Sequence, residues 1–149
     1  MRKINLLVIH CSATRTNQDI GANQIKKWHT DPKPKGRGWK DIGYHYVIRR
    51  DGSLEDGRPN QIIGAHAKGF NKTSLGICMV GGLNLESKPS NNFSKAQYKT
   101  LRMLIRFLQK LYNIPDIRVI GHRELPKVHK SCPCFEVSPW LKKNKMSVS

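Results

Sequence analysis

Short apolar runs, separated by polar and glycine-rich stretches, mark out three strands along the chain. Residues 4–9 and 75–80 are rich in Leu, Val and Ile, which is typical of short buried strands. Residues 117–120 form a third run of the same kind. The first run stops at His10, and the third is followed after one residue by His122. Two of the three predicted strands therefore lead into a histidine.

Other stretches repeat apolar residues every three or four positions, which is the spacing of one face of a helix. The clearest covers residues 94–112 and starts with a capping box formed by Ser94 and Gln97. A shorter helix is predicted over residues 20–29, and another near 139–143. The sequence thus predicts one long helix and two short ones.

A hairpin is predicted between residues 44–50 and 53–55. These segments flank Asp51-Gly52, a dipeptide that favours a type I′ turn, which needs a positive φ at both central positions. The order along the chain is then strand, helix, hairpin, strand, helix, strand and short helix. This order predicts a mixed α/β fold of the α+β type, with a central mixed sheet flanked by about three helices. We expect a single domain over residues 1–149, with its core at about 4–143.

Composition narrows the class of protein. With 38% hydrophobic and 25% charged residues, the chain is neither a disordered tail nor collagen-like. No apolar run reaches the ~20 residues of a membrane span or the ~7–15 of a signal-peptide core, so we expect synthesis in the cytoplasm without a signal peptide. The four cysteines are then expected to be reduced thiols. The net charge of +17 favours a polyanionic partner such as nucleic acid, anionic lipid or a cell-wall polymer.

The two histidines that follow strands are the first candidates for chemistry. If those strands are parallel neighbours, His10 and His122 lie at the same carboxyl edge of the sheet, where ligand sites gather. Cys132 follows in a Pro-rich loop that can fold back over this edge. Two imidazoles and a thiolate suit Zn²⁺ and leave its fourth position open, as in a catalytic site. Taken singly, each histidine is more simply explained as a hydrogen-bonded residue at a strand end, and the cysteine as a small buried thiol. Spacing alone therefore leaves both the metal site and these simpler interpretations open.

Seven short segments form a pattern that is specific because they occur together and in order. They are Val8-Ile-His-Cys-Ser-Ala-Thr14, Asp41-Ile-Gly-Tyr-His-Tyr46, Arg50-Asp-Gly52, Ala65-His-Ala-Lys-Gly69, Gly76-Ile-Cys-Met-Val-Gly-Gly82, Val119-Ile-Gly-His-Arg-Glu124 and Lys130-Ser-Cys-Pro133. With them the chain resembles the type 2 N-acetylmuramoyl-L-alanine amidases, a branch of the peptidoglycan recognition protein superfamily. Within that branch it looks most similar to the amidases called lysozymes in the T-odd coliphages. The resemblance covers residues 6 to about 141.

The resemblance implies roles for particular residues. The zinc ligands of the family fall on His10, His122 and Cys132, which implies one Zn²⁺ per chain. A tyrosine of the family's Gly-Tyr-His motif falls on Tyr44. A lysine two positions before the ligand cysteine falls on Lys130. Both of these are implied to act in catalysis, Lys130 by stabilising an oxyanion and Tyr44 through the attacking water or the leaving amine.

Two further residues are candidates for substrate binding. His66 lies in a segment that lines the substrate cleft in relatives, so the resemblance implies a contact with substrate. Trp39 stands beside a basic, glycine-rich loop, and its position alone makes it a candidate for contact with a glycan.

The implied activity is zinc-dependent hydrolysis of the amide bond between N-acetylmuramic acid and L-alanine in peptidoglycan. We expect a monomeric, endolysin-like enzyme of phage or prophage type that acts at the cell wall after release or export. Its basic surface would bind anionic envelope polymers. The alternatives are a non-catalytic peptidoglycan-binding domain and a regulator that binds nucleic acid or RNA polymerase. The retained Cys132 favours the enzyme, because non-catalytic members of the superfamily lack that cysteine.

Overall fold

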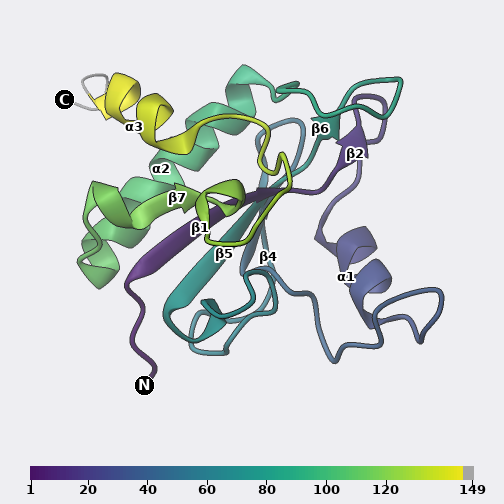
Figure 1. Ribbon diagram of the computed structural model, residues 1–149, viewed down its shortest axis with the longest axis horizontal. Coiled ribbons are helices and arrows are strands. Elements are labelled where there is room, and N and C mark those ends of the chain that lie inside the picture. The colour runs from purple at the N-terminus through teal and green to yellow at the C-terminus, as the bar shows by residue number, and fades with distance from the viewer. Residues whose placement is uncertain (146–149) are drawn as a thin grey trace.

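The computed structural model describes residues 1–145 and places five strands in one sheet (Figure 1). In order across the sheet they are β4 (Leu54–Asp56), β3 (Tyr46–Ile48), β5 (Ser74–Met79), β1 (Leu6–Cys11) and β7 (Val119–Gly121). Strands β3, β5, β1 and β7 run parallel to one another, and β4 is antiparallel to β3. The central mixed sheet predicted from the sequence is confirmed, and β1 and β7 are parallel neighbours.

Three helices cover the two faces of this sheet. The long α2 (Lys95–Tyr112) and the C-terminal α3 (Val137–Lys145) lie on one side, and α1 (Ala22–Thr30) lies on the other (Figure 1). Short elements complete the fold: the ribbon of β2 (Thr14–Arg15) and β6 (Gly82–Leu83), and the 3-10 helices η1 (Asn71–Thr73), η2 (Asp116–Arg118) and η3 (His122–Glu124). Within residues 1–145, no helix has the length and apolar composition needed to cross a membrane.

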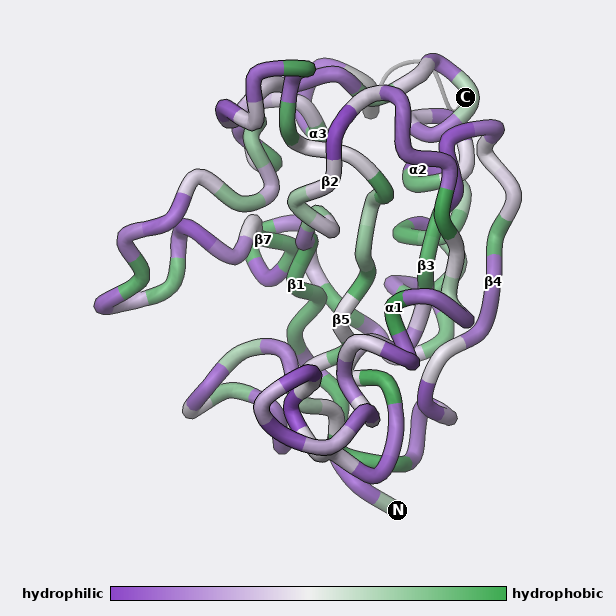
Figure 2. Tube along the Cα trace, turned by 90° about the vertical axis from the view of Figure 1, so that its right-hand side faces the viewer, coloured by the Kyte–Doolittle hydropathy of each residue, from purple (hydrophilic) through white to green (hydrophobic). Residues whose placement is uncertain are grey.

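The alternation of side chains along β1 divides its residues between two layers. Leu7 and Ile9 pack with α2 and α3 in the largest buried cluster. Leu6 and Val8 face the opposite layer, which is built largely from long loops. Figure 2 shows the apolar segments gathered along β1 and β5 in the middle of the molecule. His10 continues the series of Leu6 and Val8, so its side chain points into the loop layer and away from α2.

The end of β1 differs from the prediction. The strand does not stop at His10 but continues through Cys11. Both residues keep their parallel partners in β5, namely Cys78 and Met79. The histidine is therefore held inside a hydrogen-bonded strand, which fixes its backbone more firmly than a position in a loop would.

The hairpin between β3 and β4 forms as predicted, but its turn is not of type I′. Gly52 has a φ of 88°, whereas Asp51 is not among the residues with positive φ. The N–H of Gly52 donates to the carbonyl of Arg49 at 2.8 Å, and the N–H of Arg49 donates to the carbonyl of Ser53 at 2.9 Å. The loop is one residue longer than a type I′ turn, so a single glycine in the left-handed region is enough.

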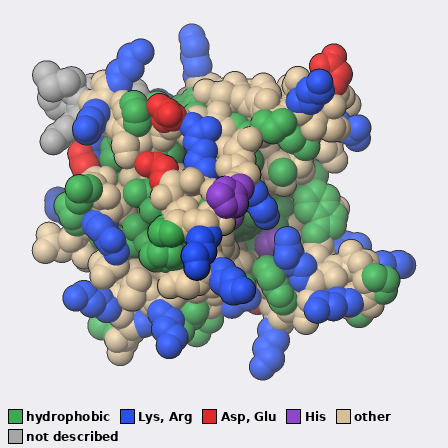
Figure 3. All heavy atoms as spheres, viewed as in Figure 1, with side chains coloured by type: hydrophobic (Ala, Val, Ile, Leu, Met, Phe, Trp, Pro, Cys, Tyr) green, Lys and Arg blue, Asp and Glu red, His purple; other side chains and the backbone are tan. Residues whose placement is uncertain are grey.

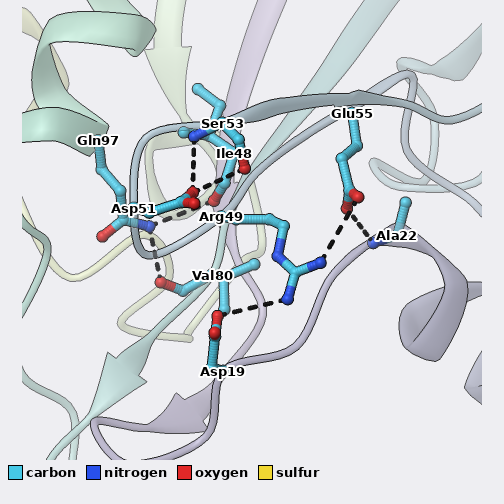
Figure 4. A network of polar contacts seen from close by, with 9 residues as sticks. All are labelled: Asp19, Ala22, Ile48, Arg49, Asp51, Ser53, Glu55, Val80 and Gln97. Carbon is cyan, nitrogen blue, oxygen red and sulfur yellow. Dashed lines mark hydrogen bonds and ion pairs between the residues drawn. The ribbon is translucent and has the colours of Figure 1, made fainter.

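The N-terminus of α1 is capped by a distant side chain. Gly21 occupies the N-cap position and offers no side chain, and Glu55 of β4 accepts a hydrogen bond from the N–H of Ala22 at 2.7 Å. Arg49 lies 3.7 Å from this carboxylate and 3.5 Å from Asp19 (Figure 4). A negative charge is favourable at this end of the helix dipole. Because the last turn of α1 forms one wall of the cleft described below, this contact helps to position the site.

Candidate metal centre

Three side chains from separate parts of the chain meet at the carboxyl edge of β1 and β7. His10 lies near the end of β1, His122 directly follows β7, and Cys132 lies on the loop that leads to α3. One ligand atom from each lies within 4.8 Å of the other two. Cys132 Sγ is 4.0 Å from His10 Nδ1, and the two imidazole centroids are 4.5 Å apart. Among the described residues, no other group of three potential ligands comes this close together.

Backbone contacts place the sulfur of Cys132. The N–H of Cys11 donates to Cys132 Sγ at 3.2 Å, and the N–H of Arg123 donates to the carbonyl of Cys132 at 2.9 Å. Gly121 allows the loop to come this close, because a Cβ at that position would lie 2.9 Å from Pro133 Cδ. Contacts from β1 and η3 thus aim the thiol at the two imidazoles.

Both histidines are held in the form that binds metal. Burial lowers the pKa of His10 well below its usual value, and His66, His122 and Lys130 lower it further. Burial, followed by the charge of Lys130, also lowers the pKa of His122. Both imidazoles are therefore neutral near pH 7, as metal ligation requires. Two imidazole nitrogens and one sulfur form a donor set that fits a tetrahedral Zn²⁺ with its fourth position open.

His66 stands directly behind His10. Its Nδ1 lies 2.8 Å from His10 Nε2, so the nitrogen of His10 that does not approach Cys132 is already engaged. On the other side, His66 Nε2 lies 3.1 Å from Ser74 Oγ. The ring fits because Gly76 has no side chain; a Cβ there would lie 2.6 Å from the imidazole. Burial, above all, lowers the pKa of His66 to about 3, so a neutral hydrogen-bonded chain leads from β5 to the ligand cluster.

Tyr44 approaches the cluster from the segment before β3. Its ring centroid lies 5.1 Å from that of His10 and 5.6 Å from that of His29. His29 is itself fixed by the N–H of Gly43, which donates to His29 Nδ1 at 2.9 Å. Burial raises the pKa of the Tyr44 phenol well above its usual value, and neighbouring thiols add to the effect. The phenol therefore keeps its proton throughout the neutral range.

An open cleft of about 790 Å³ surrounds these groups. Lys68 and Lys130 line it and are exposed to solvent. Trp39 also lines it, with its ring centroid 5.0 Å from the Arg37 guanidinium and 4.9 Å from the His29 ring. In Figure 3 a histidine is visible deep in a recess right of centre, with Lys and Arg side chains around it. The cleft thus suits a ligand that combines apolar faces with negative charge.

The structure brings every candidate from the sequence to this one cleft. The lining includes His10, Trp39, Tyr44, His66, His122, Lys130 and Cys132. Sequence reasoning missed two supporting groups, the ring of His29 beside Tyr44 and the hydroxyl of Ser74 behind His66. The signal for Ser74 was a polar residue at the start of an otherwise apolar strand; His29 gave no comparable signal.

Comparison with known proteins decides the family. A family model described as N-acetylmuramoyl-L-alanine amidase matches residues 1–135, which include all three candidate ligands. The chain belongs to the N-acetylmuramoyl-L-alanine amidase family. The matched region contains all seven segments that carried the resemblance, so the resemblance is confirmed.

Relatives of this amidase include phage endolysins. The endolysin of Escherichia phage T7 is 40% identical over 143 residues, covering 96% of this chain and 89% of the relative. The endolysin of Klebsiella phage KP32 is 39% identical with the same coverage.

Solved structures show the same fold. The amidase LysC from Clostridium intestinale URNW has a TM-score of 0.75 at 28% identity, covering 99% of this chain and 88% of that one. Drosophila PGRP-LB has a TM-score of 0.72 at 26% identity, covering 95% and 81%. Family membership and these neighbours confirm the expected hydrolase class and the mixed α/β amidase fold.

Proposed function

We propose that the protein is a zinc-dependent amidase that hydrolyses the bond between N-acetylmuramic acid and L-alanine in peptidoglycan. The observation that carries the proposal is the convergence of His10, His122 and Cys132 in a chain that the amidase family model matches. A domain that only bound peptidoglycan would not need two neutral imidazoles and a sulfur around one point. The phage endolysins among the relatives support an action at the cell wall.

His10 Nδ1, His122 and Cys132 Sγ would hold one Zn²⁺ per chain. Bound there, zinc supplies Lewis-acid activation of the attacking water and of the scissile carbonyl. The protein keeps the donor atoms together: the pairing of β1 with β7 fixes the histidines. The N–H of Cys11 and the space at Gly121 fix the sulfur.

Lys130 is assigned to charge stabilisation. It lines the cleft, and its charge lowers the pKa of both His10 and His122. In the reaction, water adds to the carbonyl carbon and negative charge develops on the carbonyl oxygen before the C–N bond breaks. An ammonium placed for that oxygen typically contributes about 2.7–4 kcal/mol to lowering the barrier.

Tyr44 is assigned to the leaving amine. The amide nitrogen must take up a proton as the C–N bond breaks. The raised pKa of Tyr44 keeps its phenol protonated, and its ring lies 5.1 Å from the ring of His10. The phenol is therefore a proton or hydrogen-bond donor beside the ligand cluster.

His66 is assigned to positioning His10. Because His66 Nδ1 engages His10 Nε2, the Nδ1 of His10 is the nitrogen left for metal. Ser74 in turn holds His66, and partners of this kind orient metal ligands and tune their affinity. His66 also lines the cleft with Trp39, and we propose that these two rings contact the substrate, the indole through the apolar face of a sugar.

The remaining expectations complete the proposal. The protein would act at the cell wall after release or export, and it would work there as a monomer whose described residues form one amidase domain. Its net charge of +17 would hold it on anionic envelope polymers.

The test compares two cysteines of the same loop. Cys132→Ser removes the sulfur donor, whereas Cys134→Ser changes a thiol that donates to the carbonyl of Gly82 at 3.3 Å. We expect wild type and Cys134→Ser to carry one zinc per chain and to release free L-alanine amino termini from purified walls. Cys132→Ser should lose its zinc and more than about 10³-fold in rate, since the metal supplies several kcal/mol. Release of reducing sugar without new amino termini, or full activity of Cys132→Ser, would overturn the proposal.

A further inference from the structure

A second hollow, of about 630 Å³, lies between α2 and α3 and is called here the α2–α3 groove. It shares no lining residue with the catalytic cleft. Its floor is aromatic: Tyr98, Phe135 and Trp140 pack against one another with ring centroids 5.2–5.8 Å apart. Phe135 is buried, whereas Trp140 is only partly buried and lines the groove, so part of its indole is accessible.

Lysines form the rim of the α2–α3 groove. Lys95 and Lys99 come from α2, one turn apart, and Lys143 comes from α3; all three are exposed. In the part of the chain that the structure describes, none of the three forms an ion pair with a carboxylate. Glu136 is the acidic residue of the groove, and it lies 3.9 Å from Arg123. The rim therefore carries excess positive charge.

The placement of Lys95 and Lys99 is unfavourable for the stability of the protein when no ligand is bound. Like charges four residues apart on a helix repel each other. Both lysines also lie in the first two turns of α2, where the helix dipole is positive and the first turn holds no acidic residue. On α1, by contrast, Lys26 and Lys27 each pair with an aspartate, at 3.6 and 3.0 Å. An anion bound between Lys95 and Lys99 would relieve their repulsion.

We propose that the α2–α3 groove binds a phosphorylated saccharide of the cell envelope. Phosphate oxygens accept charge-assisted hydrogen bonds from the lysine rim, and the indole of Trp140 packs against the apolar face of a sugar ring. The inference rests on the proposed function only in placing the protein at the envelope. Because Tyr98 and Phe135 pack against Trp140, the groove offers one platform. Single-stranded nucleic acid uses successive platforms for successive bases, so a saccharide fits better.

One loop joins the α2–α3 groove to the catalytic cleft. Lys130 and Cys132 line the cleft, and Phe135 and Glu136 line the groove. Cys132 and Phe135 are three positions apart in the chain, so their backbones lie at most about 10 Å from each other. A saccharide in the groove would thus hold the enzyme beside its polymeric substrate and leave the cleft free to turn over.

The experiment measures binding of a defined oligosaccharide that bears two phosphate groups, by titration calorimetry with the zinc-loaded protein. We expect it to bind wild type at least tenfold more tightly than its dephosphorylated form and than inorganic tripolyphosphate. Lys95→Gln/Lys99→Gln should weaken binding at least tenfold. The matched control, Lys72→Gln/Lys110→Gln, also removes two exposed charges, but outside both hollows, and should change affinity less than twofold.

Three outcomes would overturn the inference. Equal losses of affinity in the two double variants would show that net charge alone explains the binding. Equal affinity for the dephosphorylated saccharide would show that the groove does not recognise the phosphate groups. Equal affinity for tripolyphosphate would show that it does not recognise the sugar. Equal or tighter binding of a twelve-residue oligothymidylate, lost in Lys95→Gln/Lys99→Gln, would make the groove a nucleic-acid site.

Hydrolysis of a small soluble muropeptide separates this inference from the proposed function. We expect the rate to be the same in wild type and in Lys95→Gln/Lys99→Gln, because neither lysine lines the cleft. If wild type binds the phosphorylated saccharide but hydrolyses no muropeptide, the proposed function is overturned and the inference about the α2–α3 groove is unaffected. A lower rate in the double variant would contradict the independence of the two sites.

Discussion

The catalytic cleft and the α2–α3 groove use polar side chains in different ways. In the cleft, His10 is buried and His66 is half-buried, and the two neutral rings are hydrogen-bonded to each other. In the groove, Lys95 and Lys99 are exposed on one helix without a carboxylate partner among the described residues. The function of the cleft depends on where individual atoms lie, whereas binding in the α2–α3 groove depends on summed charge and apolar area. Small changes of position should therefore matter far more in the cleft.

Within this comparison the largest effect is expected for Lys130→Gln, a variant that tests whether position outweighs charge inside the cleft. Lys130→Gln should lower kcat by about 10²–10³-fold, because one preorganised donor to the developing oxyanion is lost. Zinc content should stay at one per chain. Lys68→Gln is the control, since Lys68 lines the same cleft and is also exposed; its kcat should fall less than about threefold. Equal losses in the two variants, measured on a soluble muropeptide, would show that the cleft also works through summed charge.

Acid should destabilise the protein through histidines that are neutral in the folded state. His45 is 1% exposed, accepts the N–H of Gly76 on Nδ1 at 3.0 Å, and has Nε2 2.9 Å from the carbonyl of Ile62. Burial lowers its pKa to about 4, and that of His29 moves in the same direction to a similar value. In the unfolded chain a histidine titrates near 6.5. Between these values only the unfolded state binds the proton, so stability is complete above pH 6.5 and is lost as the pH falls towards 4.

The size of this effect can be checked by urea unfolding at several pH values. For His45 alone the free energy of unfolding should fall by roughly 3 kcal/mol between pH 7 and pH 4. His45→Gln should be less stable than wild type at pH 7 and should show a shallower dependence on pH. Parallel pH profiles for the two proteins would contradict the role given to His45.

Replacing His66 tests the hydrogen-bonded chain behind the metal site. His66→Leu should weaken zinc binding by about 10–100-fold, because His10 loses the partner that orients it. His66→Asn should recover part of the affinity, since its amide can reach towards His10 Nε2. Zinc affinity is measured by competition with a chelator, and the absorption spectrum of the cobalt-substituted protein reports ligand geometry. A lower melting temperature with unchanged affinity and spectrum would mean that His66 only fills space.

The smallest effect is expected for Glu55→Gln, which changes a structural contact outside both hollows. Glu55→Gln should lower the free energy of unfolding by about 1 kcal/mol, because the N–H of Ala22 loses a charged acceptor at the start of α1. Glu86→Gln, on an exposed loop, should change it by less than about 0.5 kcal/mol. Both are measured by chemical denaturation. A large loss of kcat in fully folded Glu55→Gln would show that α1 affects the chemistry more directly.

The sequence revealed the parts of the site that follow simple rules. His10 and His122 were found because each follows an apolar run, and parallel strands end at a common edge. Cys132 was a candidate because its Pro-rich loop can fold back over that edge. Tyr44 and Lys130 came only from the resemblance of short segments, because isolated side chains carry no period of their own.

Other features depend on contacts between distant residues. The cap of α1 comes from Glu55, which lies 33 positions beyond Ala22 in the chain. The contact of His66 with His10 requires the register that places Gly76 beside Val8, together with a loop folded over that gap. The type I′ turn predicted at Asp51-Gly52 was wrong, because the preference of a dipeptide for a turn type does not fix the length of the loop.

Gly76 illustrates how a core position can serve the chemistry instead of the packing. It lies within β5, where its neighbours in sequence, Leu75 and Ile77, are completely buried. An engineer seeking a stiffer strand would be drawn to alanine or valine at this point. The added side chain would have to displace the imidazole of His66, so a gain in strand propensity would come with the loss of the hydrogen bond that orients His10.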